Sequence, residues 1–258
     1  MAGAGEVERT DYTPKSSFAD DLRVLKAMWF GSVSGDSHQD QLESFYNKQA
    51  HLYDQYRHRM LHGRKPLMMN MPVKKGCVWV DLGGGTASNV EFFGKSVMTD
   101  WFKSVHVVDL TPSLVRVAKK RVEDNNWGGK VNIILGDATD PNLEGLPPSG
   151  SCDVVSISYA VTMIPNWRDV LKNAHRLLKP GGHICVCDFT VDRDSQWGIS
   201  KTFWKYLFST DHIYLSEEHI ETLQSMFDQT RLEVNYGTFP YVPFFLKCPY
   251  YAYIGQKK

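Results

Sequence analysis

The sequence predicts an α/β fold in which helices cover both faces of a seven-stranded, mostly parallel sheet. From Cys77 onward, short apolar runs alternate with helical patterns, as they do in successive βαβ units. The runs are almost unbroken in apolar character, which is typical of strands buried on both faces. The first run also leads directly into three glycines and a further helical pattern. These observations indicate one α/β domain over residues 77–258.

Length and composition fit one domain with an N-terminal extension. Of the 258 residues, 42% are hydrophobic and 22% are charged, which excludes a disordered or fibrous protein. The 29 basic and 29 acidic residues cancel, so we expect no nucleic-acid partner. Five cysteines without a CxxC pair indicate a reducing, cytoplasmic location and no metal site. No apolar run reaches the ~18 residues that a membrane-spanning helix needs.

Two segments precede the domain. Residues 1–21 are small, polar and interrupted by proline, so we expect a flexible leader. Residues 22–76 are expected to form a helical cap, because helical apolar stripes occur over 22–30 and over 39–61. The cap helices would therefore come before the first strand.

The elements of the domain follow in order along the chain. The expected strands cover residues 77–82, 104–110, 130–135, 152–158, 183–189, 230–236 and 250–256. Thr111 as N-cap and Pro112 at the first helical position begin a crossover helix after the second strand. A helix over 167–178 ends at the proline and glycines that follow it, and Ser216 caps another helix. Each helix separates two strands, as a parallel sheet requires.

The most specific motif is VDLGGGTA, residues 80–87, where a strand enters a glycine turn. Glycines lack the Cβ atoms that would block a ligand, and a following helix would offer unpaired amides and the positive end of its dipole. A dinucleotide and S-adenosylmethionine both suit such a turn. Ser88 stands where the dinucleotide fingerprint GxGxxG has its third glycine, which favours S-adenosylmethionine.

Two acids follow the next two strands. Asp109 ends the second strand, where an acidic side chain accepts hydrogen bonds from ribose hydroxyls in nucleotide-binding sheets. Asp137 ends the third strand, where its carboxylate can accept a hydrogen bond from an adenine amino group. The carboxyl ends of parallel strands share one edge of the sheet, so both acids should lie beside the glycine turn. A nucleoside cofactor is therefore predicted at that edge.

Five segments carry a family resemblance: VDLGGGTA, the acid of VVDLT, the GDAT turn, the strand CDVVSISYAVTMIP and LLKPGG. Over about residues 50–258 they resemble the class I S-adenosylmethionine-dependent methyltransferases. The resemblance implies a Rossmann-like sheet whose last strand is antiparallel, with S-adenosylmethionine as cofactor. The cofactor-binding residues expected on this basis are Asp81, Gly83, Gly85, Thr86, Asp109, Leu110, Asp137, Ala138, Ser158 and Tyr159. Ala87 departs from the pattern, because many members carry glycine there.

The flanking segments carry a narrower resemblance. LESFYNKQAHLYDQYRHRMLHGR, SYAVTMIPNW, FWKYLFSTDHIYLSEEH and PYVPFFLKCPYYAYIGQK look like the N-methyltransferase domain of betaine lipid synthases. That resemblance implies methylation of the amine of a diacylglyceryl homoserine-type lipid to its betaine. The family's second activity, aminocarboxypropyl transfer, has no room in this chain, so a separate transferase is an expected partner. A lipid substrate would also imply peripheral contact with an internal membrane such as the endoplasmic reticulum.

Candidate bases lie in these flanking segments. Methyl transfer to an amine is an in-line displacement, in which the protein mainly positions and desolvates the reactants. The amine must be neutral to attack, and Tyr53, His62 and His212 are the candidates for catalysis. The alternative for each histidine is a structural role.

Candidate substrate residues are aromatic or basic. Trp204 and Tyr214, like Tyr53, could face a methylated cation through cation–π attraction, and core packing is the alternative. Arg57 and Arg64 could grip the carboxylate of a homoserine headgroup, and a solvated helix face is the alternative.

Other functions stay open. The acceptor could be a soluble small amine or a quinone ring carbon, and a non-catalytic S-adenosylmethionine-binding protein would use the same fold. A dinucleotide oxidoreductase is disfavoured by Ser88. For membrane contact, the candidates are the apolar loop 241–246 and the helix over 22–30, with core packing as the alternative for both.

Overall fold

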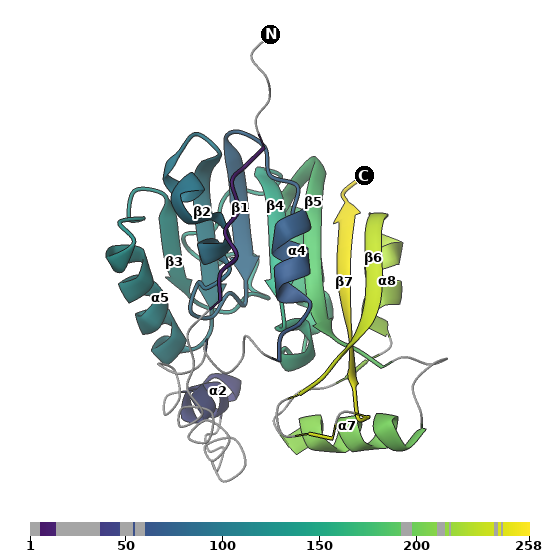
Figure 1. Cartoon of the computed structure of the whole chain (residues 1–258). Coiled ribbons are helices and arrows are strands. Elements are labelled where there is room, and N and C mark those ends of the chain that lie inside the picture. The colour runs from purple at the N-terminus through teal and green to yellow at the C-terminus, as the bar shows by residue number, and fades with distance from the viewer. Residues whose placement is uncertain are drawn as a thin grey trace.

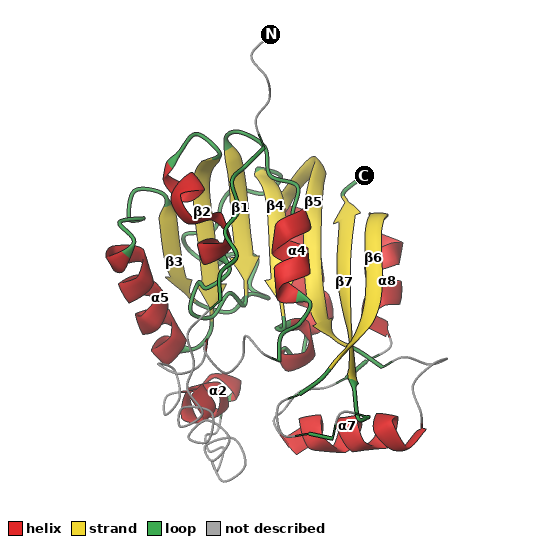
Figure 2. Ribbon diagram, in the orientation of Figure 1, coloured by secondary structure: helices red, strands yellow, loops and turns green. Residues whose placement is uncertain are grey.

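The strands of the computed structural model form one sheet. The structure describes residues 6–13, 37–46, 54, 60–191, 198–210, 215–216, 218–239, 242–243 and 245–258. Within them seven strands pair in the order β3-β2-β1-β4-β5-β7-β6 (Figures 1 and 2). β7 is antiparallel to both of its neighbours, and the other neighbouring strands are parallel. The predicted fold class, with its antiparallel last strand, is confirmed.

Each predicted strand is present. The strands are β1 (Cys77–Leu82), β2 (Phe102–Asp109), β3 (Val131–Leu135), β4 (Cys152–Ser158), β5 (Leu178–Phe189), β6 (Asp228–Gly237) and β7 (Cys248–Gln256). β5 begins five residues earlier than expected, because Leu178 already pairs with Cys152 on β4. Gly181, at φ +74°, carries the chain through this irregular start and donates its N–H to the carbonyl of Lys257.

The helices lie on both faces and at the carboxyl edge of the sheet (Figure 1). The α-helices described are α2 (His38–Tyr46), α4 (Arg64–Asn70), α5 (Pro112–Asp124), α6 (Trp167–Leu177), α7 (Gly198–Thr210) and α8 (Glu218–Met226). Two 3₁₀ segments, η1 (Val90–Met98) and η2 (Val161–Met163), complete them. The predicted crossover helices correspond to α5 and α6, and the helix after Ser216 corresponds to α8.

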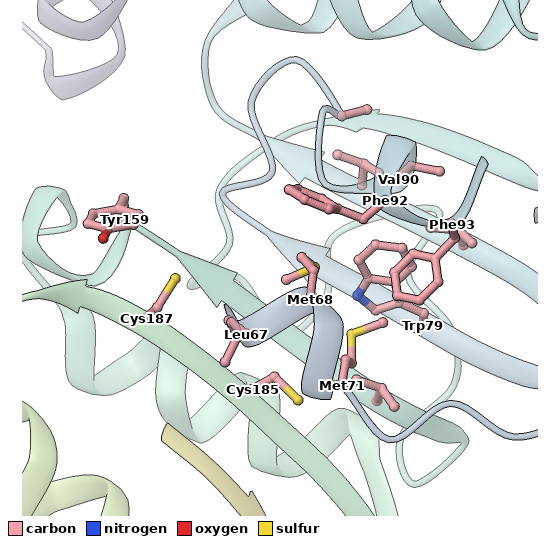
Figure 3. Packing of buried hydrophobic residues seen from close by; sticks show 14 of the residues in the cluster. Leu67, Met68, Met71, Trp79, Val90, Phe92, Phe93, Tyr159, Cys185 and Cys187 are labelled. Carbon is pink, nitrogen blue, oxygen red and sulfur yellow. The ribbon is translucent and has the colours of Figure 1, made fainter. Parts of the chain in front are cut away.

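Alternate residues of β1 face two separate cores. Trp79 points toward α4 and η1, where its ring packs against Phe93 at 5.4 Å between centroids (Figure 3). Val80 and Leu82 point to the opposite face and join the buried residues of α6 and α8. All three side chains are fully buried, which is the two-sided burial that the apolar runs predicted.

The first residues described are not a free leader. Residues 6–13 run across the face that carries α4 and η1, and Val7 is 5% exposed there. The Arg9 guanidinium donates hydrogen bonds to the carbonyls of Met68 and Met71, at 3.2 and 2.7 Å. This part of the predicted leader 1–21 is therefore an ordered part of the structure. Sequence reasoning missed it because these hydrogen bonds join segments about sixty residues apart.

The cap region differs from the expected pair of helices. The helix expected over 22–30 lies outside the described residues, as does most of the second helix beyond Tyr46. A further helix, α4, begins at Arg64 and packs over β5 and β7. Its seven residues include Pro66 in the first turn, where proline costs no helical hydrogen bond.

Replacing Arg9 tests the ordered N-terminal segment. Arg9→Ala should lower the free energy of unfolding by about 1–3 kcal/mol, because two carbonyls of α4 and its C-cap lose a charged donor. Urea denaturation followed by circular dichroism measures the change. Glu8→Ala is the matched control, since that side chain is exposed. Equal midpoints for the two variants would contradict the packing of residues 6–13.

Candidate active site

A cavity of about 210 Å³ lies at the carboxyl edge of the sheet. Its walls come from the glycine turn, from α2, and from the segments that follow β2, β3 and β4. Eight of the ten residues predicted to bind the cofactor line it: Gly83, Gly85, Asp109, Leu110, Asp137, Ala138, Ser158 and Tyr159. The structure thus brings together residues that are up to 76 positions apart in the chain.

The glycine turn passes three times through the left-handed backbone region. Gly83, Gly85 and Ala87 have φ values of +69°, +57° and +59°. A Cβ atom on Gly83 would lie 2.5 Å from the Cβ of Ala160, so this position requires glycine on two grounds. Ala87 keeps a backbone conformation that glycine adopts most easily. The departure noted at Ala87 therefore leaves the path of the turn unchanged.

The segment after the turn corrects one expectation. No α-helix begins there: turns lead into η1, which is broken at Gly94 (φ +45°, ψ −122°). The predicted helix dipole beneath the cofactor is therefore absent from this described segment. Hydrogen bonds hold the turn instead, from Gly84 N–H to the Val108 carbonyl and from Ala87 N–H to the Gly84 carbonyl, both at 3.0 Å.

Asp109 binds a backbone amide of the glycine turn. Its Oδ2 accepts the N–H of Gly85 at 2.8 Å, and its Oδ1 accepts the N–H of Thr111 at 2.9 Å. Burial raises the pKa of this carboxyl, while the hydrogen bonds from Thr111 and Gly85 oppose the rise. A carboxylate fixed in this way has lone pairs remaining for two neighbouring hydroxyls, which is the arrangement of a ribose 2′,3′-diol.

The segment after β3 supplies the second acid. Asp137 is exposed, and its Oδ1 accepts hydrogen bonds from the N–H and the hydroxyl of Thr139. Asn173 on α6 donates to the carbonyl of Ala138 at 2.8 Å and so fixes this turn against the sheet. The turn can therefore present a carboxylate oxygen and backbone groups to an adenine edge.

Two of the predicted cofactor residues point elsewhere. Asp81 is fully buried beneath the turn, where it accepts hydrogen bonds from Ser156 at 2.5 Å and Asn89 at 2.9 Å. The Thr86 hydroxyl donates to Asp54 at 2.7 Å. Neither residue lines the cavity. Both instead form hydrogen bonds on the side of the turn away from the cavity. Strand periodicity explains Asp81, because it shares a face of β1 with Trp79.

The buried carboxyl groups of Asp81 and Asp188 both have raised pKa values. Burial raises the pKa of each from 3.8 to about 6, against hydrogen bonds that lower it. The folded chain therefore binds these protons more tightly than the unfolded chain does. Their contribution to stability is complete below pH 3.8 and is lost as the pH rises through about 6. Asp188 accepts the Thr162 hydroxyl at 2.7 Å and so ties η2, next to the cavity, to β5.

Of the predicted catalytic residues, His62 is the one among the described residues, and it does not line the cavity. Its Nε2 lies 2.8 Å from the carbonyl of Thr238, and its ring stacks on Tyr250 at 5.9 Å. The next residue, Gly63, donates its N–H to the hydroxyl of Tyr159, which lines the cavity. Four of the other predicted residues, Tyr53, Arg57, His212 and Tyr214, lie outside the described residues.

Arg64 and Trp204 are both buried and line no part of the cavity. Arg64 donates to the Ser88 hydroxyl at 2.6 Å and lies over the ring of Phe92. Trp204 is fully buried among aromatic rings and donates its indole N–H to the carbonyl of Lys247. Because neither side chain reaches the cavity, these placements correct the expectation that they face a substrate.

Sequence reasoning missed the wall that α2 provides. Leu42 lines the cavity, Gln39 donates to the carbonyl of Leu110, and Glu43 accepts the N–H of Ser113 at 2.8 Å. The carboxylate of Glu43 thus caps the first turn of α5, where negative charge is favoured. The apolar pattern over 39–61 predicted a helix there, but it did not show which face of that helix lines the cavity.

No membrane-crossing helix or metal cluster is found in the described part of the chain. None of its helices is long and apolar enough to span a bilayer. No three His, Cys, Asp or Glu side chains within those residues converge on a position that could hold a metal ion. In the loop predicted to contact a membrane, Phe245 is 67% exposed, while Tyr241 and Phe244 are not among the described residues.

Comparison with known proteins identifies the class. The family model for the methyltransferase domain matches residues 45–235. The ubiquinone/menaquinone biosynthesis C-methyltransferase UbiE of Hahella chejuensis is 26% identical over 179 residues, 62% of this chain and 68% of that protein. UbiE of Hydrogenovibrio crunogenus is 33% identical over 46% of this chain and 44% of its own length. The demethylmenaquinone methyltransferase of Geobacillus stearothermophilus is 30% identical over 57% of this chain and 59% of its own.

Solved structures share the fold at low identity. Geranyl diphosphate C-methyltransferase from Streptomyces coelicolor, solved with S-adenosylhomocysteine, gives a TM-score of 0.60 at 14% identity and covers 88% of this chain and 90% of its own. An S-adenosylmethionine-dependent methyltransferase from Aquifex aeolicus gives a TM-score of 0.55 at 16% identity. The match covers 81% of this chain and 97% of that chain.

These matches settle the class of the protein. It is an S-adenosylmethionine-dependent methyltransferase, and the predicted cofactor is confirmed. Because the family model covers most of its length, the chain belongs to the methyltransferase-domain family. The chain spans 44 to 68% of the length of the three relatives named above, all of which are named as methyltransferases of quinone biosynthesis or of demethylmenaquinone. They lend no support to the narrower resemblance to betaine lipid synthases.

A glycine pair tests the turn. Gly83→Ala and Gly150→Ala both place a side chain at φ +69°, at a cost of ~1–2 kcal/mol. Only Gly83 also meets Ala160, since the space around Gly150 is open. Calorimetry with S-adenosylhomocysteine should show binding weakened at least about tenfold in Gly83→Ala and unchanged in Gly150→Ala. Equal affinities would exclude the turn from the site.

Asp109→Asn tests the ribose anchor. The amide carries no charge and presents only one acceptor oxygen to the N–H groups of Gly85 and Thr111, so the Kd for S-adenosylhomocysteine should rise about tenfold to a hundredfold. The wild-type chain should also lose affinity at acidic pH, because the raised pKa of Asp109 brings protonation closer to neutrality. Asp140→Asn, in the nearby exposed turn, is the control. Unchanged binding by Asp109→Asn would contradict the assignment.

Proposed function

We propose that this methyltransferase acts on a lipid-soluble acceptor, and that the acceptor atom is a ring carbon of a quinol. The observation that carries the proposal is the set of relatives: two of the three reported above are named for C-methylation in ubiquinone or menaquinone biosynthesis, and the third is named a demethylmenaquinone methyltransferase. Prenylated quinols and diacylglyceryl lipids are both membrane-soluble. The two acceptors differ in the atom that attacks the methyl group.

The bound cofactor supplies a methyl group on a sulfonium sulfur, which becomes a neutral thioether when the methyl leaves. The chain holds the cofactor by its ribose and adenine through Asp109 and Asp137, and α2 covers the cavity. A quinol carbon becomes nucleophilic when the neighbouring hydroxyl loses its proton, and after transfer the ring carbon loses its own. The protein must therefore accept protons near the acceptor.

The side of the cavity next to Tyr159 suits this proton transfer. Tyr159 has a φ of +53°, an uncommon value for a bulky residue, and its ring packs edge-on against Phe189 at 4.7 Å. Burial raises the pKa of Tyr159 well above 10, so its hydroxyl stays protonated while it accepts the Gly63 N–H. His62, one residue before the Gly63 that binds Tyr159, is the candidate base.

The second candidate is N-methylation of a diacylglyceryl homoserine-type lipid, and the flanking segments favour it. They resemble betaine lipid synthases in stretches before β1, directly after β4 and after β5. An amine acceptor needs a site that tolerates a growing cation. The ring of Tyr250, stacked on His62, is the aromatic face that we propose for such a cation. A separate aminocarboxypropyl transferase stays the expected partner for this candidate.

One labelling assay separates the candidates. Purified protein with methyl-labelled S-adenosylmethionine is offered, in separate detergent mixtures, a demethylated prenyl quinol, diacylglyceryl homoserine and ethanolamine. We expect label on the quinol ring carbon, located by mass spectrometry, and none with the Gly83→Ala variant. Label on the homoserine nitrogen would overturn the proposal in favour of the second candidate. Cofactor binding without transfer to any acceptor would indicate a non-catalytic binding protein.

A further inference from the structure

Asp54 links the region before the sheet to the glycine turn. This carboxylate is 9% exposed. Its Oδ1 accepts the Thr86 hydroxyl at 2.7 Å, and its Oδ2 pairs with the Arg121 guanidinium at 2.5 Å. Thr86 belongs to the turn and Arg121 to α5, so one side chain joins three parts of the fold.

Both partners of Asp54 are themselves enclosed. Thr86 is fully buried between Gly85 and Ala87, the two residues with φ near +60°. The Arg121 side chain is 13% exposed, lies over the ring of Tyr12 and comes within 3.6 Å of Glu91. Burial lowers the pKa of Arg121, but Asp54, Tyr12 and Glu91 together outweigh it, so the net shift is upward. The hydroxyl and the cation would each lose a buried partner without Asp54.

The contact bears on the cofactor because of its position in the turn. The residue before Thr86, Gly85, lines the cavity and donates its N–H to Asp109, the predicted ribose anchor. A shift of the Thr86 side chain would therefore displace the peptide that orients Asp109. Neither Asp54 nor the Thr86 hydroxyl lines the cavity, so any effect on the cofactor must pass through the turn.

We propose that Asp54 is a positioning residue for S-adenosylmethionine: through the Thr86 hydroxyl it fixes the glycine turn in the conformation that the cofactor requires. The proposal concerns the cofactor half of the site and holds for any methyl acceptor. A purely structural role would lower stability and leave cofactor affinity unchanged. A direct contact between Thr86 and the cofactor would make the effect of Thr86 independent of Asp54.

A double-mutant cycle on the full chain tests this. Asp54→Asn and Thr86→Val should each raise the Kd for S-adenosylhomocysteine about tenfold, measured by calorimetry, and the double variant should be no weaker than either single variant. Thr86→Ser, which keeps the hydroxyl, should bind like the wild type. With whichever acceptor is methylated, the KM for S-adenosylmethionine should rise while kcat changes little.

The controls keep the outcome decisive. Asp124→Asn breaks the exposed pair with Lys120 on the same helix and should leave affinity unchanged. If Asp54→Asn fails to fold, as judged by circular dichroism, the comparison of Thr86→Val with Thr86→Ser carries the test, because both leave the Arg121 pair in place. Unchanged Kd in folded Asp54→Asn, equal binding by the two Thr86 variants, or a hundredfold loss in the double variant would each overturn the proposal.

Discussion

The cofactor site depends on a turn whose backbone is unfavourable and must be held in place. Three of the five residues from Gly83 to Ala87 have positive φ, and one of them is an alanine. Three buried carboxylates surround the turn: Asp109 binds a turn amide directly, and Asp54 binds a turn hydroxyl. The third, Asp81, lies underneath and acts through Asn89, which also donates to Ser158 at the end of β4. The turn is thus fixed to neighbouring strands from several directions.

The sequence alone was enough to predict the strands of the sheet and the two acids at its carboxyl edge. Apolar runs with both faces buried located β1 to β5, because burial on two faces leaves little room for polar residues. Asp109 and Asp137 could be predicted because the carboxyl ends of parallel strands lie at one edge of the sheet. Residues that directly follow such strands therefore lie close together. The resemblance to methyltransferases then supplied the ligand.

Other features depend on contacts that local patterns do not encode. Residues 6–13 are polar and short, and the hydrogen bonds from Arg9 to α4 decide their place. The segment after the turn looked helical, but the conformation of Gly94 breaks it into 3₁₀ turns. For Asp81 the information was present in the sequence, since Val80 and Leu82 occupy one face of β1 and leave Asp81 on the other.

The charges around the turn bear on which form of the cofactor binds more tightly. Within the described residues no Lys, Arg or His side chain forms an ion pair with Asp109, which accepts hydrogen bonds from two backbone amides and from the Thr111 hydroxyl. Asp54, in contrast, is neutralised by Arg121. An enclosed carboxylate without a neutralising cation attracts a positively charged ligand more strongly than a neutral one of the same shape. S-adenosylmethionine carries its positive charge on sulfur and its demethylated product does not, so an unpaired carboxylate at this edge of the sheet would bind the sulfonium form more tightly than the neutral product.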